Sequence, residues 1–314
     1  MIIPPDRAAA LINQGQVVAL PTETVYGLAA DASNLNAVSR IFELKKRPAD
    51  NPLIVHISDI RQMSAFSENT NPDDIQKLAD AFWPGPLTMV LPKKSSVLDV
   101  VTAGLDTVAL RMPDHPTTLK IIDQSRPVAA PSANRSGRPS PTRAEHVIED
   151  FGESLPVVDG GICRVGLEST VLDLTGVMPA ILRPGAISGK NIAQVLGRKI
   201  QLEAAAGSEQ SKRSPGTRYS HYQPDASVRW MDTSNTKHLP DTLFIYHTSL
   251  PDIEGPNVIN FNKDIEALAR SLYDLYRTAD RQGYASIMIE PIPSDHPSPL
   301  MPAIKNRIDR SIGL

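Results

Sequence analysis

Residues 21–57 read PTETVYGLAADASNLNAVSRIFELKKRPADNPLIVHI, and the rest of the chain is arranged around this stretch. A short apolar strand, Val17–Leu20, leads into it, and a helix over Leu35–Lys46 follows a polar turn. A second strand, Leu53–Ile57, ends it after a loop bracketed by prolines. About forty residues is the size of one βαβ unit. The stretch therefore predicts two strand ends and one helix end that meet at one place.

Polar and cationic side chains gather at these ends. Thr22 and Thr24 lie in the turn, and His56 lies in the second strand. Lys45 and Arg47 lie at the C-terminal end of the helix. Basic residues suit the negative pole of the helix dipole, which by itself explains the lysine. The combination of cations, hydroxyls and a histidine nevertheless predicts a pocket for an anionic ligand.

Length and charge limit the class of protein. The chain has 314 residues, which is long for a single hydrophobic core, so two domains are expected. Its formal net charge is −3 and its pI is near 6.2, values that argue against a protein that coats nucleic acid by bulk electrostatics. A local basic pocket on a mildly acidic body agrees with both numbers.

The residue types argue against several kinds of site. Cys163 is the single cysteine, so neither an internal disulfide nor a thiolate zinc cluster is expected. The seven histidines show no metal-binding spacing, and no protein-held metal is predicted. No apolar run approaches the ~20 residues that a membrane-spanning helix needs, and the N-terminus lacks a signal pattern. We therefore expect a cytoplasmic protein without membrane partners.

Helices and strands alternate on either side of the opening stretch. Pro5–Gln14 is a short helix, and Asn71 caps another helix that starts at Pro72. The helix over 35–46 is expected to bury one face, formed by Leu35, Val38, Ile41 and Phe42. These apolar stripes indicate helices that pack against a sheet.

Two strands, at residues 87–91 and 107–112, come next, and the second ends in Arg111. A charge at the carboxyl edge of an apolar strand is either a surface arginine or a ligand-binding residue, because open α/β sheets bind ligands at that edge. The sequence leaves both interpretations open.

The loop PVAAPSANRSGRPSPT, residues 127–142, is rich in small, hydroxyl and amide residues. Its backbone N–H groups can approach a ligand closely, and Ser132 and Asn134 can add side-chain hydrogen bonds. It matches neither a Walker loop nor a GxGxxG fingerprint. Thr142 and Glu145 are spaced as a capping box for a helix that ends at Phe151.

Three more strands complete the first domain, near Leu155–Val158, Ser169–Leu174 and Ala180–Leu182. Arg183 directly follows the last of them. A final helix, Asn191–Leu196, is capped by Ser188, and the domain is expected to span residues 1–204.

Residues 205–225 begin as a polar linker and then read SPGTRYSHYQP. This aromatic segment is interpreted either as a linker docked on a domain face or as a strap over the pocket. Residues 226–314 are a second α/β domain with four short strands, a long helix at Ile265–Gln282 and a basic helix, IKNRIDRS, at the end. No catalytic constellation is found in it.

The pattern predicts an α/β protein with some α+β character. Its first part is a twisted open mixed sheet whose helices form a cationic cavity, and a smaller Rossmann-like α/β domain follows. Several blocks then carry a resemblance over the whole chain: PTETVYGL at the start, Lys45-Lys46-Arg47, Asn51–His56, Ser132-Ala133-Asn134, LESTV at 167–171, LRPG at 182–185 and the strap at 215–224. In this order they resemble the YrdC-like threonylcarbamoyl-AMP synthases in their long, two-domain form.

The resemblance implies a nucleotidyltransferase that condenses L-threonine, bicarbonate and ATP to L-threonylcarbamoyladenylate and pyrophosphate. Mg²⁺ would enter with ATP. The product would pass to a separate complex that modifies the adenosine next to the anticodon of certain tRNAs. Stable nucleic-acid binding by this chain is not expected.

The resemblance also implies roles for individual residues. Lys45 and Arg47 would be catalytic through the triphosphate. The nucleotide would further contact Asn51, Thr107, Ser132, Asn134, Thr142, Arg183 and Tyr219. Threonine would contact Thr24, His56, Arg111 and Ser169, with the arginine on its carboxylate.

Two other functions are weighed against the synthase. An RNA-binding or ribosome-assembly module could use the same cationic cavity, but the negative net charge argues against it. A carbamoyl-transfer domain would be part of a larger enzyme with partner domains that this chain does not show. The synthase is preferred.

Overall fold

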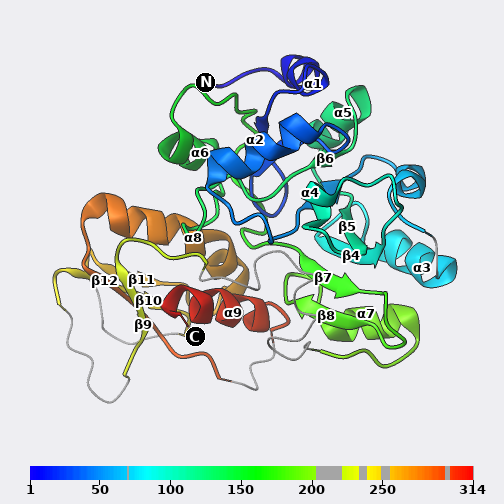
Figure 1. The fold of residues 1–314 in the computed structure, drawn as a ribbon. Coiled ribbons are helices and arrows are strands. Elements are labelled where there is room, and N and C mark those ends of the chain that lie inside the picture. The colour runs from blue at the N-terminus through cyan, green and yellow to red at the C-terminus, as the bar shows by residue number, and fades with distance from the viewer. Residues whose placement is uncertain (69–70, 203–220, 233–238, 249–254, 294–297, 314) are drawn as a thin grey trace.

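The computed structural model describes residues 1–68, 71–202, 221–232, 239–248, 255–293 and 298–313. In this part of the chain, an eight-stranded mixed sheet and its helices form an N-terminal unit, and a four-stranded sheet with two helices forms a C-terminal unit (Figure 1). The fold class predicted from the sequence, an open mixed sheet followed by a smaller α/β unit, is confirmed.

The larger sheet contains β1 (Val18–Leu20), β2 (Gly27–Asp31), β3 (Ile54–His56), β4 (Leu87–Pro92), β5 (Thr107–Arg111), β6 (Val128–Ala129), β7 (Thr170–Asp173) and β8 (Ala180–Arg183). Their order across the sheet is β1-β2-β6-β3-β5-β4-β7-β8. The pairs β3–β5 and β4–β7 are parallel, and the other neighbours are antiparallel.

The helices around this sheet are α1 (Pro5–Asn13), α2 (Leu35–Lys45), η1 (a 3₁₀ helix, Ile60–Ala65), α3 (Pro72–Phe82), α4 (Asp99–Thr102), α5 (Pro116–Gln124), α6 (Ala144–Phe151) and α7 (Gly189–Leu196). At the β1–β2 end, α2 and α6 pack on one face and α1 and α5 on the other. Helices α3, α4 and α7 cover one face of the central strands. The opposite central face carries a small apolar cluster with Ile54, against which the cavity described below lies.

Strand β2 was not predicted, and its presence changes the connectivity expected for residues 21–57. β1 turns directly into β2, its antiparallel partner, so α2 connects β2 to β3. Both β2 and β3 pair antiparallel with β6, which lies between them, and they are therefore parallel to each other. The βαβ unit exists, but with a different first strand and another strand inserted. All five residues of β2 are buried, so the sequence shows none of the polar alternation that marks a half-exposed strand.

Some local predictions are wrong. Leu35 is 54% exposed, because it stands in the first turn of α2 and points away from the core. Residues 155–158 form only isolated bridges at Val157 rather than a strand. Thr142 is not a helix cap: Arg143 occupies the cap position of α6, and the Thr142 N–H instead donates to His146 Nδ1. Asn71 does precede α3, but its side chain bonds to Asp74 and not to the helix backbone.

The C-terminal unit contains β9 (Ser227–Trp230), β10 (Thr242–Tyr246), β11 (Val258–Asn260) and β12 (Ser286–Ile289), with helices α8 (Ile265–Gln282) and α9 (Met301–Ile312). The strands are parallel in the order β11-β10-β12-β9. Helix α8 has the predicted bounds, and α9 starts earlier than predicted. Both helices pack on one face of the sheet, in a core with Leu243 and Ile245.

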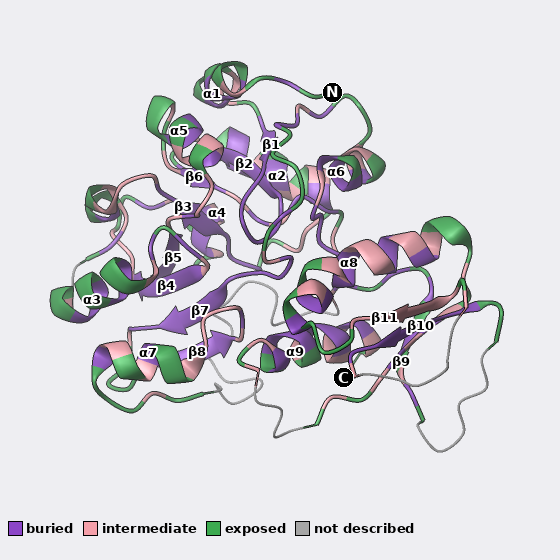
Figure 2. Cartoon of the chain, turned by 180° about the vertical axis from the view of Figure 1, so that it is seen from behind, coloured by how far each residue is buried: buried purple, intermediate pink, exposed green. Residues whose placement is uncertain are grey.

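That helical face is turned towards the N-terminal unit (Figures 1 and 2). Several ion pairs cross between the units, among them Arg143–Asp274, Arg277–Asp150, Arg281–Glu149 and Arg307–Glu168. The first three join α8 to α6 or the residue before it, and the fourth joins α9 to the segment before β7. The C-terminal unit is therefore docked beside the cavity of the N-terminal unit.

Candidate active site

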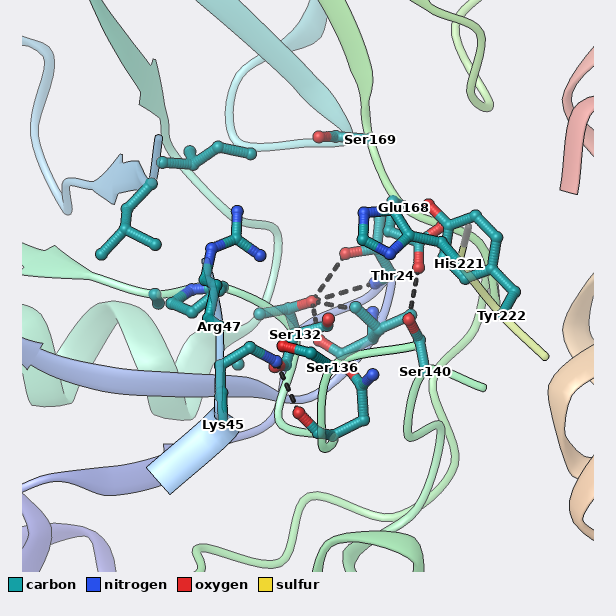
Figure 3. A pocket seen from close by; sticks show the side chains of 18 of the residues that line it. Thr24, Lys45, Arg47, Ser132, Ser136, Ser140, Glu168, Ser169, His221 and Tyr222 are labelled. Atoms are coloured by element: carbon teal, nitrogen blue, oxygen red, sulfur yellow. Dashed lines mark hydrogen bonds between the residues drawn. The ribbon is translucent and has the colours of Figure 1, made fainter. Parts of the chain in front are cut away.

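A cavity lies where the ends of α2, β3, β5 and β8 converge with the 130–140 loop. Figure 3 shows part of its wall. The predicted site residues that line it are Thr24, Lys45, Arg47, His56, Arg111, Ser132, Asn134, Ser169 and Arg183. Tertiary structure thus gathers segments that are up to about 160 residues apart in the sequence.

Lys45 is buried, and its side-chain nitrogen is bonded to the backbone of the 130–140 loop (Figure 3). Nζ donates to the backbone oxygens of Ser132 and Asn134, at 2.5 and 2.6 Å. Burial, followed by the nearby charge of Arg47, lowers its pKa well below the usual value. One lysine therefore fixes the backbone of the Ser132–Asn134 segment from within the cavity wall.

Arg47 and Arg183 approach the cavity from different sides. Arg47 donates to the backbone oxygens of Asn51 and Pro52, at 3.1 and 2.9 Å, so the loop between α2 and β3 fixes its orientation. Arg183 donates from Nη2 to the backbone and hydroxyl oxygens of Ser169, at 3.0 and 3.1 Å. Burial lowers the pKa of Arg47 to about 10, which still leaves it cationic at neutral pH.

Arg111 is buried, so the interpretation as a surface arginine is wrong. Its Nη2 lies 2.7 Å from Glu23 Oε2, in an ion pair whose side chains are 5% and 2% exposed. The two charges are close but not aligned as a hydrogen bond, and Nε donates to the Gly85 backbone oxygen at 3.3 Å. Glu23 was not predicted, although it stands between two predicted threonines in PTETVYGL.

Both histidines of the cavity are neutral at physiological pH. Burial, with Arg111 adding to it, lowers the pKa of His56 to about 3. Its Nδ1 lies 3.3 Å from the Ile54 carbonyl oxygen, which can only accept. The proton therefore sits on Nδ1, and Nε2 is left as an acceptor. Burial and the charges of Arg47 and Lys45 lower the pKa of His221 to about 4.

Two hydroxyl pairs complete this wall. Thr24 Oγ1 lies 2.8 Å from Thr22 Oγ1, which also donates to the Val25 backbone oxygen. Ser169 Oγ lies 2.7 Å from Thr88 Oγ1, in addition to its bond from Arg183. These hydroxyls are held in fixed positions and can bind a small polar ligand without reorganising.

Three predicted residues are not among those that line the cavity, and a fourth lies outside the described residues. Asn51, Thr107 and Thr142 are buried but do not line the cavity. Tyr219 falls in 203–220, outside the described part of the chain. Their roles stay predictions.

Sequence reasoning also missed lining residues. Ser140, Glu168, His221 and Tyr222 face the cavity. The last two belong to the aromatic segment that was interpreted as a strap, so their residue types already carried a signal. Glu168 stood next to a predicted serine, but nothing local marked it as buried.

The cavity residues do not fit a metal bound directly by protein. Within the described residues, no group of three or more His, Cys, Asp or Glu side chains is arranged to hold an ion. The carboxylate in the wall, Glu168, already accepts from Ser140 and Arg307. Among the helices that these residues form, none combines the length and apolar character that crossing a bilayer requires.

Two family models account for nearly the whole chain. Residues 10–185 match the Sua5–YciO–YrdC family, described as "Telomere recombination", and residues 187–313 match "Threonylcarbamoyl-AMP synthase, C-terminal domain". The fold and the cationic cavity thus define a Sua5–YciO–YrdC-type protein with a second domain.

Individual relatives agree with the models. The chain is 42% identical to threonylcarbamoyl-AMP synthase of Pyrococcus abyssi over 98% of its length and 93% of the relative's, and 41% identical to that of Bacillus subtilis over 98% and 92%. The crystal structure of P. abyssi Sua5 complexed with L-threonine superposes with a TM-score of 0.86 and 38% identity, covering 100% of this chain and 98% of the other. E. coli YciO, 20% identical with a TM-score of 0.53, shares the fold of 60% of this chain and 92% of its own.

The chain belongs to the threonylcarbamoyl-AMP synthase family. The resemblance drawn from the sequence blocks is therefore confirmed. Members of this family are enzymes that make an adenylate, a reaction of the nucleotidyltransferase type.

Proposed function

We propose that this chain is an L-threonylcarbamoyladenylate synthase that uses L-threonine, bicarbonate and ATP and releases pyrophosphate. The observation that carries the proposal is the composition of the cavity. Four arginines (Arg47, Arg111, Arg138 and Arg183) and a lysine line it, together with a histidine that is neutral and presents an acceptor nitrogen. Such a wall suits a polyanion beside a small zwitterion.

The triphosphate is assigned to Lys45, Arg47 and Arg183. ATP would enter as its Mg²⁺ complex, so the metal arrives with the substrate and shares the phosphate charge with the arginines. Arg47 is already oriented by two backbone carbonyls, which reduces the reorganisation needed during the reaction. Asn134 has a buried Oδ1 without a hydrogen-bond partner among the described atoms, an acceptor that suits the nucleotide.

Threonine is assigned to the other side of the cavity. Arg111 retains donors beyond its contacts with Glu23 and Gly85, and these suit the threonine carboxylate. His56 Nε2 would accept a hydrogen bond from the amine nitrogen. Thr24 and Ser169 supply fixed hydroxyl groups for the remaining polar atoms.

The chemistry requires no protein nucleophile. The threonine amine attacks the carbon of bicarbonate, water leaves, and a carbamate results. A carbamate oxygen then attacks the α-phosphorus of ATP, and pyrophosphate leaves. Catalysis consists of positioning the reactants and neutralising the phosphate charge. The buried cations of the cavity suit that task, and they do not suit an RNA-binding surface, which needs exposed cations.

The remaining assignments extend the same proposal. Ser132 would contact the nucleotide, together with Asn51, Thr107, Thr142 and Tyr219. The product would pass in the cytoplasm to a separate complex that modifies tRNA next to the anticodon. The domain limits proposed from the sequence, 1–204, 205–225 and 226–314, stand as part of this proposal.

Purified protein tests the proposal directly. With ATP and Mg²⁺, pyrophosphate should be released only when threonine and bicarbonate are both present, and a product of the mass of threonylcarbamoyl-AMP should accumulate. Turnover that does not depend on threonine would contradict the assignment.

A variant pair tests the triphosphate site. Arg47→Lys keeps the charge but loses the guanidinium fork, so turnover should fall on the order of 10²-fold. Arg40→Ala, in the helix that precedes Arg47 and in an exposed ion pair with Glu43, is the matched control and should leave turnover unchanged. Equal rates for the two variants would show that the triphosphate lies elsewhere.

A further inference from the structure

Glu168 lies in the wall of the cavity, and the C-terminal unit holds it from behind. Arg307 of α9 donates from Nε to Glu168 Oε2 at 2.7 Å, and the Tyr273 hydroxyl of α8 donates to the same oxygen at 3.0 Å. Ser140 donates to Oε1 at 2.5 Å from the 130–140 loop (Figure 3). One carboxylate therefore joins a cavity loop to two helices that belong to the other sheet.

Arg307 also bridges two strand ends. Its side chain is fully buried, Nη2 donates to the Glu168 backbone oxygen at 3.2 Å, and Nη1 donates to the Pro184 backbone oxygen at 2.9 Å. Glu168 precedes β7 and Pro184 follows β8, so these contacts flank Ser169 and Arg183. A lysine cannot reach all three oxygens, because it lacks the planar fork.

Tyr222 is held by the same two residues. Its ring centroid lies 5.3 Å from that of Tyr273, and the Arg307 guanidinium carbon lies 5.6 Å from the Tyr222 ring centroid. Tyr222 has φ = 68°, a conformation that bulky residues rarely adopt and that the surroundings must stabilise. The ring faces the cavity beside His221.

We propose that Arg307 and Tyr273 are positioning residues of the active site, through which the C-terminal unit orients Glu168 and Tyr222 and so forms the rear wall of the cavity. The inference rests on the proposed reaction, since that reaction takes place in this cavity. It gives the C-terminal unit a part in catalysis that requires no ligand of its own.

The charge state of Glu168 can be measured, and it would not change if Arg307 and Tyr273 only attached the C-terminal unit to the N-terminal unit. Burial raises the pKa of this carboxyl, but the charges of Arg307 and Arg183 and the bonds from Ser140 and Arg307 outweigh burial and lower the pKa to about 2. Glu168 therefore stays ionised across the working pH range. The titratable and charged groups that face it are Arg307, Arg183, Tyr273, Tyr222 and His221.

Arg307→Gln removes the largest of the effects that keep Glu168 ionised. The pKa of Glu168 should then rise by about 1–3 units, the usual effect of one close opposite charge. Protonation of this carboxyl should therefore lower kcat/KM at an acid pH where Glu168 of the wild type is still ionised, which places the acid limb of the variant at higher pH. In a Glu168→Gln background there is no carboxyl group to titrate, and adding Arg307→Gln should no longer move that limb.

Two milder variants keep the test decisive if Arg307→Gln does not fold. Arg307→Lys should retain the acid limb near its wild-type position while kcat/KM falls on the order of 10- to 100-fold, because the charge stays but the wall is misplaced. Tyr273→Phe keeps the ring against Tyr222 and removes one donor, so it should shift the limb in the same direction as Arg307→Gln, by less.

Arg281→Gln is the control. It breaks an ion pair with Glu149 across the same interface, at 2.7 Å, but both side chains are partly exposed and lie outside the cavity wall. Its profile should match the wild type. The inference is overturned if Arg281→Gln shifts the acid limb as much as Arg307→Gln, or if Arg307→Lys and Tyr273→Phe both keep wild-type kcat/KM and pH profile. Failure of the proposed function would instead appear as absence of product in the wild type.

Discussion

The surroundings of single side chains in this cavity determine their hydrogen bonding and protonation, which the residue type alone does not. Lys45 has a sufficient explanation at the sequence level, as a cation at the end of a helix, yet its ammonium group bonds to two loop carbonyls. His56 resembles a candidate acid or base, but burial keeps its ring neutral. In both cases desolvation sets the chemistry, and desolvation depends on residues distant in the sequence.

His56→Gln tests that neutrality through stability. The pKa of His56 is lowered from 6.5 to about 3, so between these values the unfolded chain binds a proton that the folded chain does not. The free energy of unfolding should therefore decrease as pH falls from 6.5 to 3, with this residue contributing a slope of up to about 1.4 kcal/mol per pH unit. The variant should lose that slope in urea unfolding measured between pH 6.5 and 4.

His221→Gln provides the comparison. The pKa of His221 is lowered to about 4, so this variant should remove a similar slope over a narrower range, ending near pH 4. An unchanged slope in His56→Gln would mean that this histidine titrates normally in the folded protein.

Some elements are held in place by close contacts between backbone segments. In the sequence, such a contact is visible only as a glycine, because any side chain would prevent it. The hairpin of β7 and β8 carries Ser169 and Arg183 next to each other, and Gly185 lies directly against the segment before β7. A Cβ atom on Gly185 would overlap the Thr170 nitrogen and lie 2.6 Å from the Ser169 carbonyl carbon. The LRPG block therefore has a steric reason for its glycine.

Gly185→Ala should separate the two strand ends. We expect a destabilisation of about 1–3 kcal/mol, typical of overpacking, and a rise in the KM for threonine because Ser169 moves. Gly176→Ala, in the turn of the same hairpin, has space for the added carbon, whose nearest neighbour is 3.6 Å away, and is the control. Thermal unfolding and kinetics of both variants check the prediction, which fails if the two behave alike.

At the scale of the whole molecule, the C-terminal unit is joined to the cavity through α8 and α9. Gly166, with φ = 77°, packs against the backbone of α8, and a Cβ there would overlap the Arg270 Cα atom and lie 2.7 Å from the Ala269 oxygen. Because α8 also carries Tyr273, a displacement of this helix would reach Glu168.

Gly166→Ala should therefore loosen the contact between the units. Gly161 has nearly the same φ, 74°, but no atom within 4 Å of an added Cβ, so Gly161→Ala carries the backbone strain without the clash. Both variants should lose about 1 kcal/mol of stability from strain, and Gly166→Ala alone should also lower kcat/KM and increase hydrogen exchange in α8. Identical exchange in α8 would argue against a tight interface at this point.

Much of the fold was predictable from local signals. The apolar stripes and caps gave α2 and α8 with bounds correct to one residue, and apolar runs gave β3, β5 and most of the second sheet. Strand β2 was missed because it is buried throughout, and a uniformly buried segment shows no alternation. The capping box at Thr142 failed because spacing cannot show where the chain bends into the helix.

The sequence by itself determined the class of fold, the cationic and hydroxyl groups of the cavity, and the family, because each rests on residue types at short range or on ordered blocks. Only the tertiary structure decided that Arg111 is buried against Glu23, that His56 is neutral, and that Arg307 and Tyr273 reach Glu168 from the other unit. These are facts of burial and of contacts over more than a hundred residues, and no local pattern encodes them. Residues 21–57 thus supply part of a cavity that the rest of the chain completes.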